Sequence, residues 1–166
     1  MSILEPTFTR NMRETHTILA PNMASIQFRI LVHVLKDEGY SVKLLDNEGP
    51  QVVRKGLTYV HNDTCYPALL VIGQMIDALD SGEYDLERTA LAITQTGGGC
   101  RASNYIHLLR KALDNAGYHA IPIVSLNLKG MNRNSGFRIT LRMLRKGIAA
   151  LLCGDTLMLL RNQVKP

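Results

Sequence analysis

The chain has 166 residues, of which 46% are hydrophobic, 20% charged and 5% aromatic, and it carries a formal net charge of +5 at pH 7. This composition is typical of one compact, water-soluble domain and excludes a disordered or fibrous chain, while no apolar run is long enough for a membrane span. Residues 1–10 lack a basic region followed by an apolar run, and the three cysteines are few and odd in number, so we expect a cytoplasmic protein with reduced thiols.

Four short apolar runs rich in β-branched residues alternate with segments of helical periodicity. The runs predict strands at residues 16–20, 42–45, 90–94 and 121–126. Between the first two, residues 23–39 keep apolar side chains at a 3.6-residue spacing, and Gly39 provides the stop that helices favour at their C-terminus. Residues 104–117 repeat this scheme between the third and fourth strands and end at Gly117. The pattern therefore contains two βαβ units.

This alternation predicts the fold class. It is typical of a mostly parallel sheet with helices on both faces, and right-handed crossovers make a doubly wound strand order such as 2-1-3-4 the simplest topology. We expect an α/β, three-layer, four-stranded, Rossmann-like or flavodoxin-like fold, with residues 1–166 in a single domain.

The connection between the second and third strands is longer than one crossover requires. Residues 49–60 predict a short helix and residues 67–81 a longer one. If the third strand is parallel to the second, the longer helix runs from the carboxyl edge of the sheet to its amino edge. Cys65, just before that helix, and Cys100, in the loop that leaves the third strand, then both lie at the carboxyl edge, where open α/β sheets bind ligands. We expect the two thiols to meet there.

The last third of the chain is basic and then apolar. Residues 136–152 predict a further helix, on which Arg138, Arg142 and Arg145 would form one basic stripe for phosphates or an acidic partner, although a solvated face is the simpler interpretation. Cys153 is expected in the core. The run at residues 156–160 is too short to span a bilayer and too apolar for a free tail, so we expect another surface to cover it. Neither a membrane nor a nucleic acid is an expected partner.

The most distinctive segment, residues 94–104, passes from a strand through Gly97, Gly98 and Gly99 into a helix. Three glycines let backbone amides close around an anion or an inorganic cluster at the helix N-terminus, whereas a tight turn needs only one glycine. The segment lacks the Lys followed by Ser or Thr of a P-loop and the G-x-G-x-x-G spacing of dinucleotide-binding folds. ATP and NAD sites are therefore unsupported.

Cys100 and Cys65 are the candidate reactive or ligating thiols. The helix dipole and the neighbouring Arg101 would favour the thiolate of Cys100, and Cys65 also precedes a helix. A cysteine phosphatase is excluded because no arginine lies six positions after either cysteine. A Cys/His nucleophile with His61 or His107 as base stays open, as does a zinc site of Cys65, Cys100 and His61, although the paired short spacings of structural zinc are missing.

Taken together, the motifs at residues 61–68 and 94–105 resemble those of a known family. The chain resembles, over residues 7–155, the C-terminal region of the large activator-related proteins of the 2-hydroxyacyl-CoA (2-hydroxyglutaryl-CoA) dehydratase system, the CoA-substrate-specific enzyme activases. The resemblance implies an iron–sulfur cluster, of the [4Fe-4S] type, with Cys65 and Cys100 as ligands. The family's ATPase module of the acetate and sugar kinase type has no counterpart in this chain. We therefore expect a fragment or module of a larger protein.

The ligand count shapes the functional hypotheses. A [4Fe-4S] cluster takes about four thiolates, so the others would come from the remainder of an activase-like protein or from a second copy of the chain, and the cluster would be lost in air. The leading hypothesis is a redox module for low-potential electron transfer to CoA-linked substrates. The alternatives are a non-catalytic domain whose glycines and basic stripe bind CoA or another phosphate, and an oligomerisation domain. No catalytic acid or base stands out, so membership of an enzyme stays open.

Overall fold

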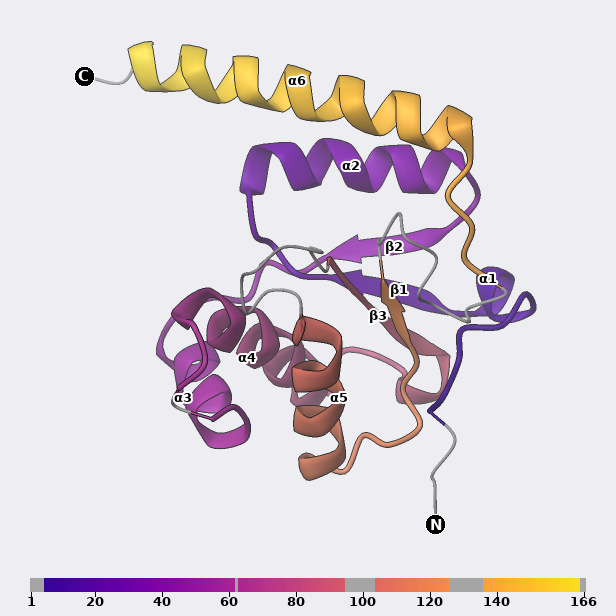
Figure 1. The fold of residues 1–166 in the computed structure, drawn as a ribbon, viewed down its shortest axis with the longest axis vertical. Coiled ribbons are helices and arrows are strands. Elements are labelled where there is room, and N and C mark those ends of the chain that lie inside the picture. The colour runs from indigo at the N-terminus through magenta and orange to yellow at the C-terminus, as the bar shows by residue number, and fades with distance from the viewer. Residues whose placement is uncertain (1–4, 62, 95–103, 126–135, 165–166) are drawn as a thin grey trace.

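The structure is a computed structural model that describes residues 5–61, 63–94, 104–125 and 136–164. They form a four-stranded sheet in the order β2-β1-β3-β4, in which every neighbouring pair is parallel (Figure 1). The strands are β1 (Thr17–Ala20), β2 (Ser41–Leu44), β3 (Thr89–Ile93) and β4 (Ile123–Ser125). The predicted α/β class and doubly wound strand order are confirmed.

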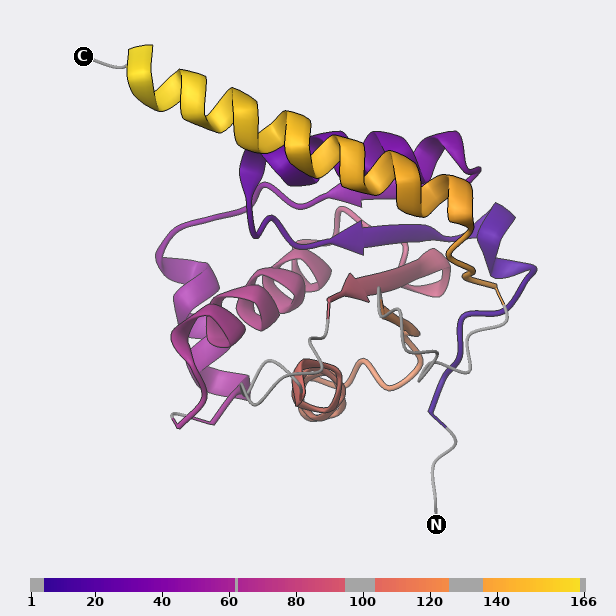
Figure 2. The ribbon, with the colours of Figure 1, turned by 45° about the horizontal axis from the view of Figure 1, so that its top comes forward.

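The helices lie on both faces of the sheet (Figure 1, Figure 2). One face carries α2 (Ser25–Asp37) and α6 (Leu141–Val164). The opposite face carries α3 (Pro50–Tyr59), α4 (Tyr66–Asp80) and α5 (Tyr105–Asn115). A short α1 (Met12–Thr15) precedes β1, and a 3₁₀ turn, η1 (Leu86–Arg88), precedes β3. Within the four described ranges, no helix has both the length and the apolarity needed to cross a membrane.

Each face of the sheet has its own hydrophobic core. Along β1, Leu19 belongs to the core under α4 and α5, whereas Ile18 and Ala20 belong to the core under α2, because successive side chains of a strand point to opposite faces. All five residues of β3 are buried. A strand that is covered on both faces reads as a continuous apolar run, which explains why β3 was visible in the sequence.

The two glycine stops behave as predicted. Gly39 follows α2 with φ +84°, and Gly117 follows α5 with φ +86°. After each glycine the chain turns back onto the helix, since the Tyr40 N–H donates to the Leu35 carbonyl at 3.2 Å and the Tyr118 N–H to the Leu113 carbonyl at 2.8 Å. This is the Schellman end, in which a left-handed residue lets the chain satisfy the last carbonyls of the helix.

Two further glycines let α3 and α4 touch backbone to backbone. A Cβ atom on Gly73 would lie 2.2 Å from the Val52 carbonyl oxygen and 2.8 Å from the Gly56 nitrogen. A Cβ atom on Gly56 would lie 2.4 Å from the Leu69 carbonyl oxygen. These neighbours are backbone atoms that cannot move aside alone, so the crossing of the two helices depends on both glycines.

The α6 helix differs from the prediction. A helix was expected over residues 136–152, with a separate apolar run after it, but a single helix continues to Val164. Gly154 does not break it: a Cβ atom there would lie 2.7 Å from Gln27 Cγ, so the glycine lets α6 approach α2. Gln27 Nε2 also donates to Asp155 Oδ1 at 2.8 Å. The prediction that Cys153 lies in the core is wrong, because this residue is exposed.

We expect Gly73→Ala to lower the free energy of unfolding by about 1–3 kcal/mol, since the added methyl group overpacks the α3–α4 crossing. Gly147→Ala is the matched control, because its Cβ atom would meet only Leu31 Cδ2, at 4.0 Å. Helix propensity then raises the stability of that variant by up to about 1 kcal/mol. Urea denaturation followed by circular dichroism measures both, and equal stabilities of the two variants would contradict the close packing of α3 and α4.

Candidate functional site

Cys65 lies at the carboxyl edge of the sheet, at the start of α4. It occupies the N-cap position of this helix, and its Sγ atom lies 3.4 Å from the hydroxyl oxygen of Tyr105, the first residue of α5. Because α5 follows β3, its N-terminus belongs to the edge at which the strands end. At the opposite ends of the two helices, the Tyr118 hydroxyl donates to Asp80. The two helices therefore run in the same direction, and α4 descends from the carboxyl edge as predicted.

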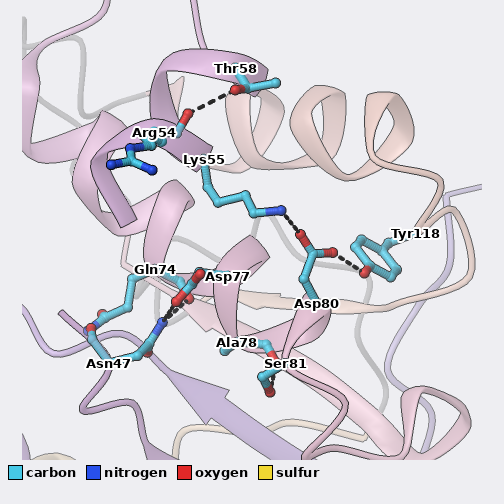
Figure 3. A network of polar contacts seen from close by, with 10 residues as sticks. All are labelled: Asn47, Arg54, Lys55, Thr58, Gln74, Asp77, Ala78, Asp80, Ser81 and Tyr118. Carbon is cyan, nitrogen blue, oxygen red and sulfur yellow. Dashed lines mark hydrogen bonds and ion pairs between the residues drawn. The ribbon is translucent and has the colours of Figure 1, made fainter. Parts of the chain in front are cut away.

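Gln74, in the middle of α4, ties the loops after β1 and β2 to the helix. The Asn22 N–H donates to Gln74 Oε1 at 2.9 Å, and Gln74 Nε2 donates to the Asn47 carbonyl oxygen at 2.8 Å. Asn47 Nδ2 in turn donates to the Gln74 carbonyl oxygen at 3.0 Å and to Asp77 Oδ2 at 2.8 Å (Figure 3). These bonds hold the carboxyl edge in one arrangement. Sequence reasoning missed this cluster, although an asparagine shortly after each of the first two strands was the available signal.

A pocket of about 310 Å³ lies among these loops and the first halves of α3 and α4. Its lining combines the side chains of Asp46, Glu48, Asn47 and Gln74 with apolar residues of the two helices such as Val52. The lining contains two carboxylates and no cation. Because like charges repel, this pocket favours a ligand rich in hydrogen-bond donors over a phosphate.

Most of the predicted glycine site lies outside the described residues. This holds for Gly97, Gly98, Gly99, Arg101 and the predicted ligand Cys100. The described flanks of the segment are Thr94, directly after β3, and Asn104, the N-cap residue of α5.

Both flanks belong to the carboxyl edge. Thr94 follows the last residue of β3, and its Oγ1 lies 3.7 Å from Sδ of Met23 in the loop after β1. Cys100 is four residues from Asn104, a stretch that spans at most about 14 Å when extended. The chain therefore enters and leaves the Cys100 segment at the edge where Cys65 lies, although the predicted meeting of the two thiols stays a prediction.

The histidines considered as partners of the cysteines are on the surface. His61 has a side-chain exposure of 75%, and its Nδ1 lies 3.4 Å from Asp63 Oδ2. His107 is an exposed residue of α5. Across residues 5–61, 63–94, 104–125 and 136–164, there is no group of three or more His, Cys, Asp or Glu side chains that could hold a metal ion. The zinc hypothesis includes Cys100, which lies outside these ranges.

The basic stripe is only partly on a helix and lies at the other end of the sheet. Arg138 precedes α6, so the prediction that it shares a helical stripe with Arg142 and Arg145 is wrong. Arg142 Nε lies 3.4 Å and Lys146 Nζ 3.6 Å from Glu38 Oε1, at the end of α2. Glu38 is three residues before β2 and therefore belongs to the amino edge of the sheet. Arg142 and Lys146 therefore have an acidic partner within the chain itself.

A second polar group joins the helices at the amino edge. Asp80 of α4 accepts hydrogen bonds from Lys55 of α3 and from the hydroxyl of Tyr118, which follows α5 (Figure 3). Partial burial, together with the hydrogen bond to Asp80, raises the pKa of Tyr118 from 10.0 to about 12. The group ties three helices together and lies at the end of α4 opposite to Cys65, so its role is structural.

Comparison with known proteins finds no matching family model, no matching curated protein and no matching solved structure.

The raised pKa of Tyr118 predicts a pH-dependent stability. The folded state favours the neutral phenol, so this contribution is complete below pH 10.0 and is lost as the pH rises towards about 12. Between these values the wild-type protein should lose more stability than Tyr118→Phe, as measured by urea denaturation at several pH values. Tyr66→Phe, at an exposed position of α4, is the control and should follow the wild type. Parallel curves for wild type and Tyr118→Phe would contradict the interaction with Asp80.

Proposed function

We propose that this domain is an iron–sulfur-cluster-binding redox module related to 2-hydroxyacyl-CoA dehydratase and its activator, and that it passes electrons at low potential to a CoA-linked substrate. The observation that carries the proposal is the position of Cys65 beside Tyr105 at the carboxyl edge. Thr94 and Asn104, which flank the Cys100 segment, belong to the same edge. The motifs around both cysteines, which resemble those of the activase family, agree with this arrangement.

The surroundings of Cys65 fit a thiolate ligand. The residue is half-buried and packs against the core formed by α4, α5 and the sheet. It occupies the N-cap position of a 15-residue helix, whose dipole stabilises negative charge at the N-terminus. A bound cluster would supply one-electron transfer, and burial together with hydrogen bonds to its sulfur atoms would set the reduction potential. Cys65 and Cys100 would be its ligands in this chain, with further ligands supplied by another part of a larger protein.

Binding of CoA phosphates is the alternative function. It would rest on Gly97, Gly98, Gly99 and Arg101, which lie between Thr94 and Asn104 in the sequence. The cations Arg142 and Lys146 contact Glu38 near the amino edge, at the end of the sheet opposite to Thr94 and Asn104. The pocket at the carboxyl edge carries the carboxylates Asp46 and Glu48, which disfavour an anion. The redox proposal therefore has the stronger support. It places the protein in the reducing cytoplasm, where the thiols stay available as ligands.

Anaerobic reconstitution with ferrous iron and sulfide tests the proposal. The wild-type protein should gain a broad visible charge-transfer absorption, together with bound iron and acid-labile sulfide. Cys65→Ser and Cys100→Ser should each lose most of both, because the chain then offers one of the two proposed ligands. Cys153→Ser is the matched control, since this thiol is exposed on α6. Equal iron, sulfide and absorption in wild type and both ligand variants would overturn the proposal.

The contact between Cys65 and Tyr105 gives a second prediction. A hydroxyl that donates to a ligating sulfur favours the more negative, reduced cluster, so its removal lowers the reduction potential. Tyr105→Phe should therefore keep the iron content of the reconstituted protein but shift its potential to a more negative value, as measured by an anaerobic redox titration. Tyr84→Phe, which removes the phenol near Lys43, is the control and should leave the potential unchanged. An unshifted potential in Tyr105→Phe would show that its hydroxyl does not act on the cluster.

A further inference from the structure

The outer surface of α6 is the most apolar exposed surface of the described chain. Among the residues that the structure describes, fourteen large hydrophobic side chains are exposed, and nine of them belong to this one helix. The nine are Leu141, Ile148, Leu151, Leu152, Leu157, Met158, Leu159, Leu160 and Val164. Exposed apolar surface that gathers in one place, instead of being scattered singly, marks an interaction site.

The exposed residues form a stripe opposite to the side that packs on α2. The inner side of α6 contributes the buried residues Met143, Ala150 and Gly154, and Gly154 lies against Gln27 of α2. On the outer side, Leu141, Ile148, Leu152 and Leu159 are separated by seven, four and seven residues, which places them along one straight line of a helix. Their exposed fractions are 74%, 52%, 63% and 58%. A helix with apolar residues on two opposite sides is typical of one that is buried on both.

We propose that this outer face of α6 pairs with α6 of a second copy of the chain, with the two helices antiparallel about a two-fold axis. The available area agrees with a dimer. A 24-residue helix is about 36 Å long and 10–12 Å wide, so the surface of its outer half has an area of roughly 600 Å². Two copies would bury about 1,200 Å², which reaches the lower limit for stable, specific interfaces.

The distribution of charge selects the antiparallel arrangement. The cations Arg142, Arg145 and Lys146 are all in the first two turns of α6. Residues 148–160 contain a single charged residue, Asp155. In a parallel pair, the basic half of one helix would lie against the same basic half of the partner helix, and the like charges would repel. An antiparallel pair separates the two basic halves and places each beside the C-terminal end of the partner helix, where the helix dipole is negative. The two-fold axis then crosses the outer face of α6 near the midpoint of residues 148–160, at the level of Gly154 along the helix.

The pairing leaves the Cys65 site unobstructed. α6 lies on the face of the sheet that carries α2, whereas Cys65 belongs to the opposite face with α3, α4 and α5 (Figure 1, Figure 2). Two copies joined through α6 would therefore hold their Cys65 sites on the outer sides of the dimer. The second copy would not supply the missing cluster ligands, so dimer formation and cluster binding are independent properties that separate experiments can test.

Analytical ultracentrifugation of the 166-residue chain at several concentrations tests the pairing. The wild-type protein should be in a concentration-dependent equilibrium between monomer and dimer. Leu152→Glu should raise the dissociation constant about tenfold or more, because it places a charge at the centre of the apolar stripe. Leu57→Glu is the matched control, since Leu57 is 53% exposed but belongs to α3, and it should dimerise like the wild type. Because Leu152 is itself 63% exposed, its replacement should leave the circular dichroism spectrum unchanged.

Two outcomes of the ultracentrifugation experiment decide the proposal. A wild-type protein that stays monomeric at all concentrations would overturn the proposal, and so would a dimer that Leu152→Glu does not weaken.

Discussion

The parallel direction of all four strands is the constraint on which the rest of the structure depends. In a parallel sheet each connection must return from the carboxyl edge to the amino edge before the next strand begins. The helices α4 and α5, which lead into β3 and β4, therefore both start at the carboxyl edge. That is why Cys65, at the start of α4, lies 3.4 Å from Tyr105 although 40 residues separate them in the chain. The proposed redox site follows from this topology more than from any local motif.

The position of α4 is secured along its whole length, and the proposed ligand benefits from it. Gln74 joins the helix to the loops after β1 and β2. The absence of a side chain at Gly73 lets α3 pack against its middle. Asp80 joins its last turn to Lys55 and Tyr118. Rigid elements hold a ligand in place better than loops do, so a thiol at the N-cap of this helix is well placed for a cluster.

The two faces of the sheet carry different proposed roles. The face with α3, α4 and α5 holds Cys65, the polar carboxyl edge and the pocket near Asp46. The face with α2 and α6 ends in the apolar stripe through Leu152, for which we propose a second copy of the chain. This division lets a dimer form without covering the redox site. It also means that further cluster ligands would have to approach from the side of α4 and α5.

Local patterns were enough to predict the strands, the glycine-terminated helices and the strand order. A buried strand such as β3 is almost continuously apolar, and only a glycine readily adopts the positive φ seen at Gly39 and Gly117. The continuation of α6 through Gly154, the exposure of Cys153 and the position of Arg138 outside the helix were not predictable in this way. The first two depend on how closely α6 approaches α2 at Gln27, a contact between residues more than a hundred positions apart. Arg138 instead donates its backbone N–H to the Tyr40 hydroxyl at 3.2 Å, a contact that is almost equally distant in the sequence. The cluster of Asn22, Asn47 and Gln74 likewise exists only because three separate segments converge at one edge. Such contacts are decided by packing in three dimensions, and periodicity within one segment carries no information about them.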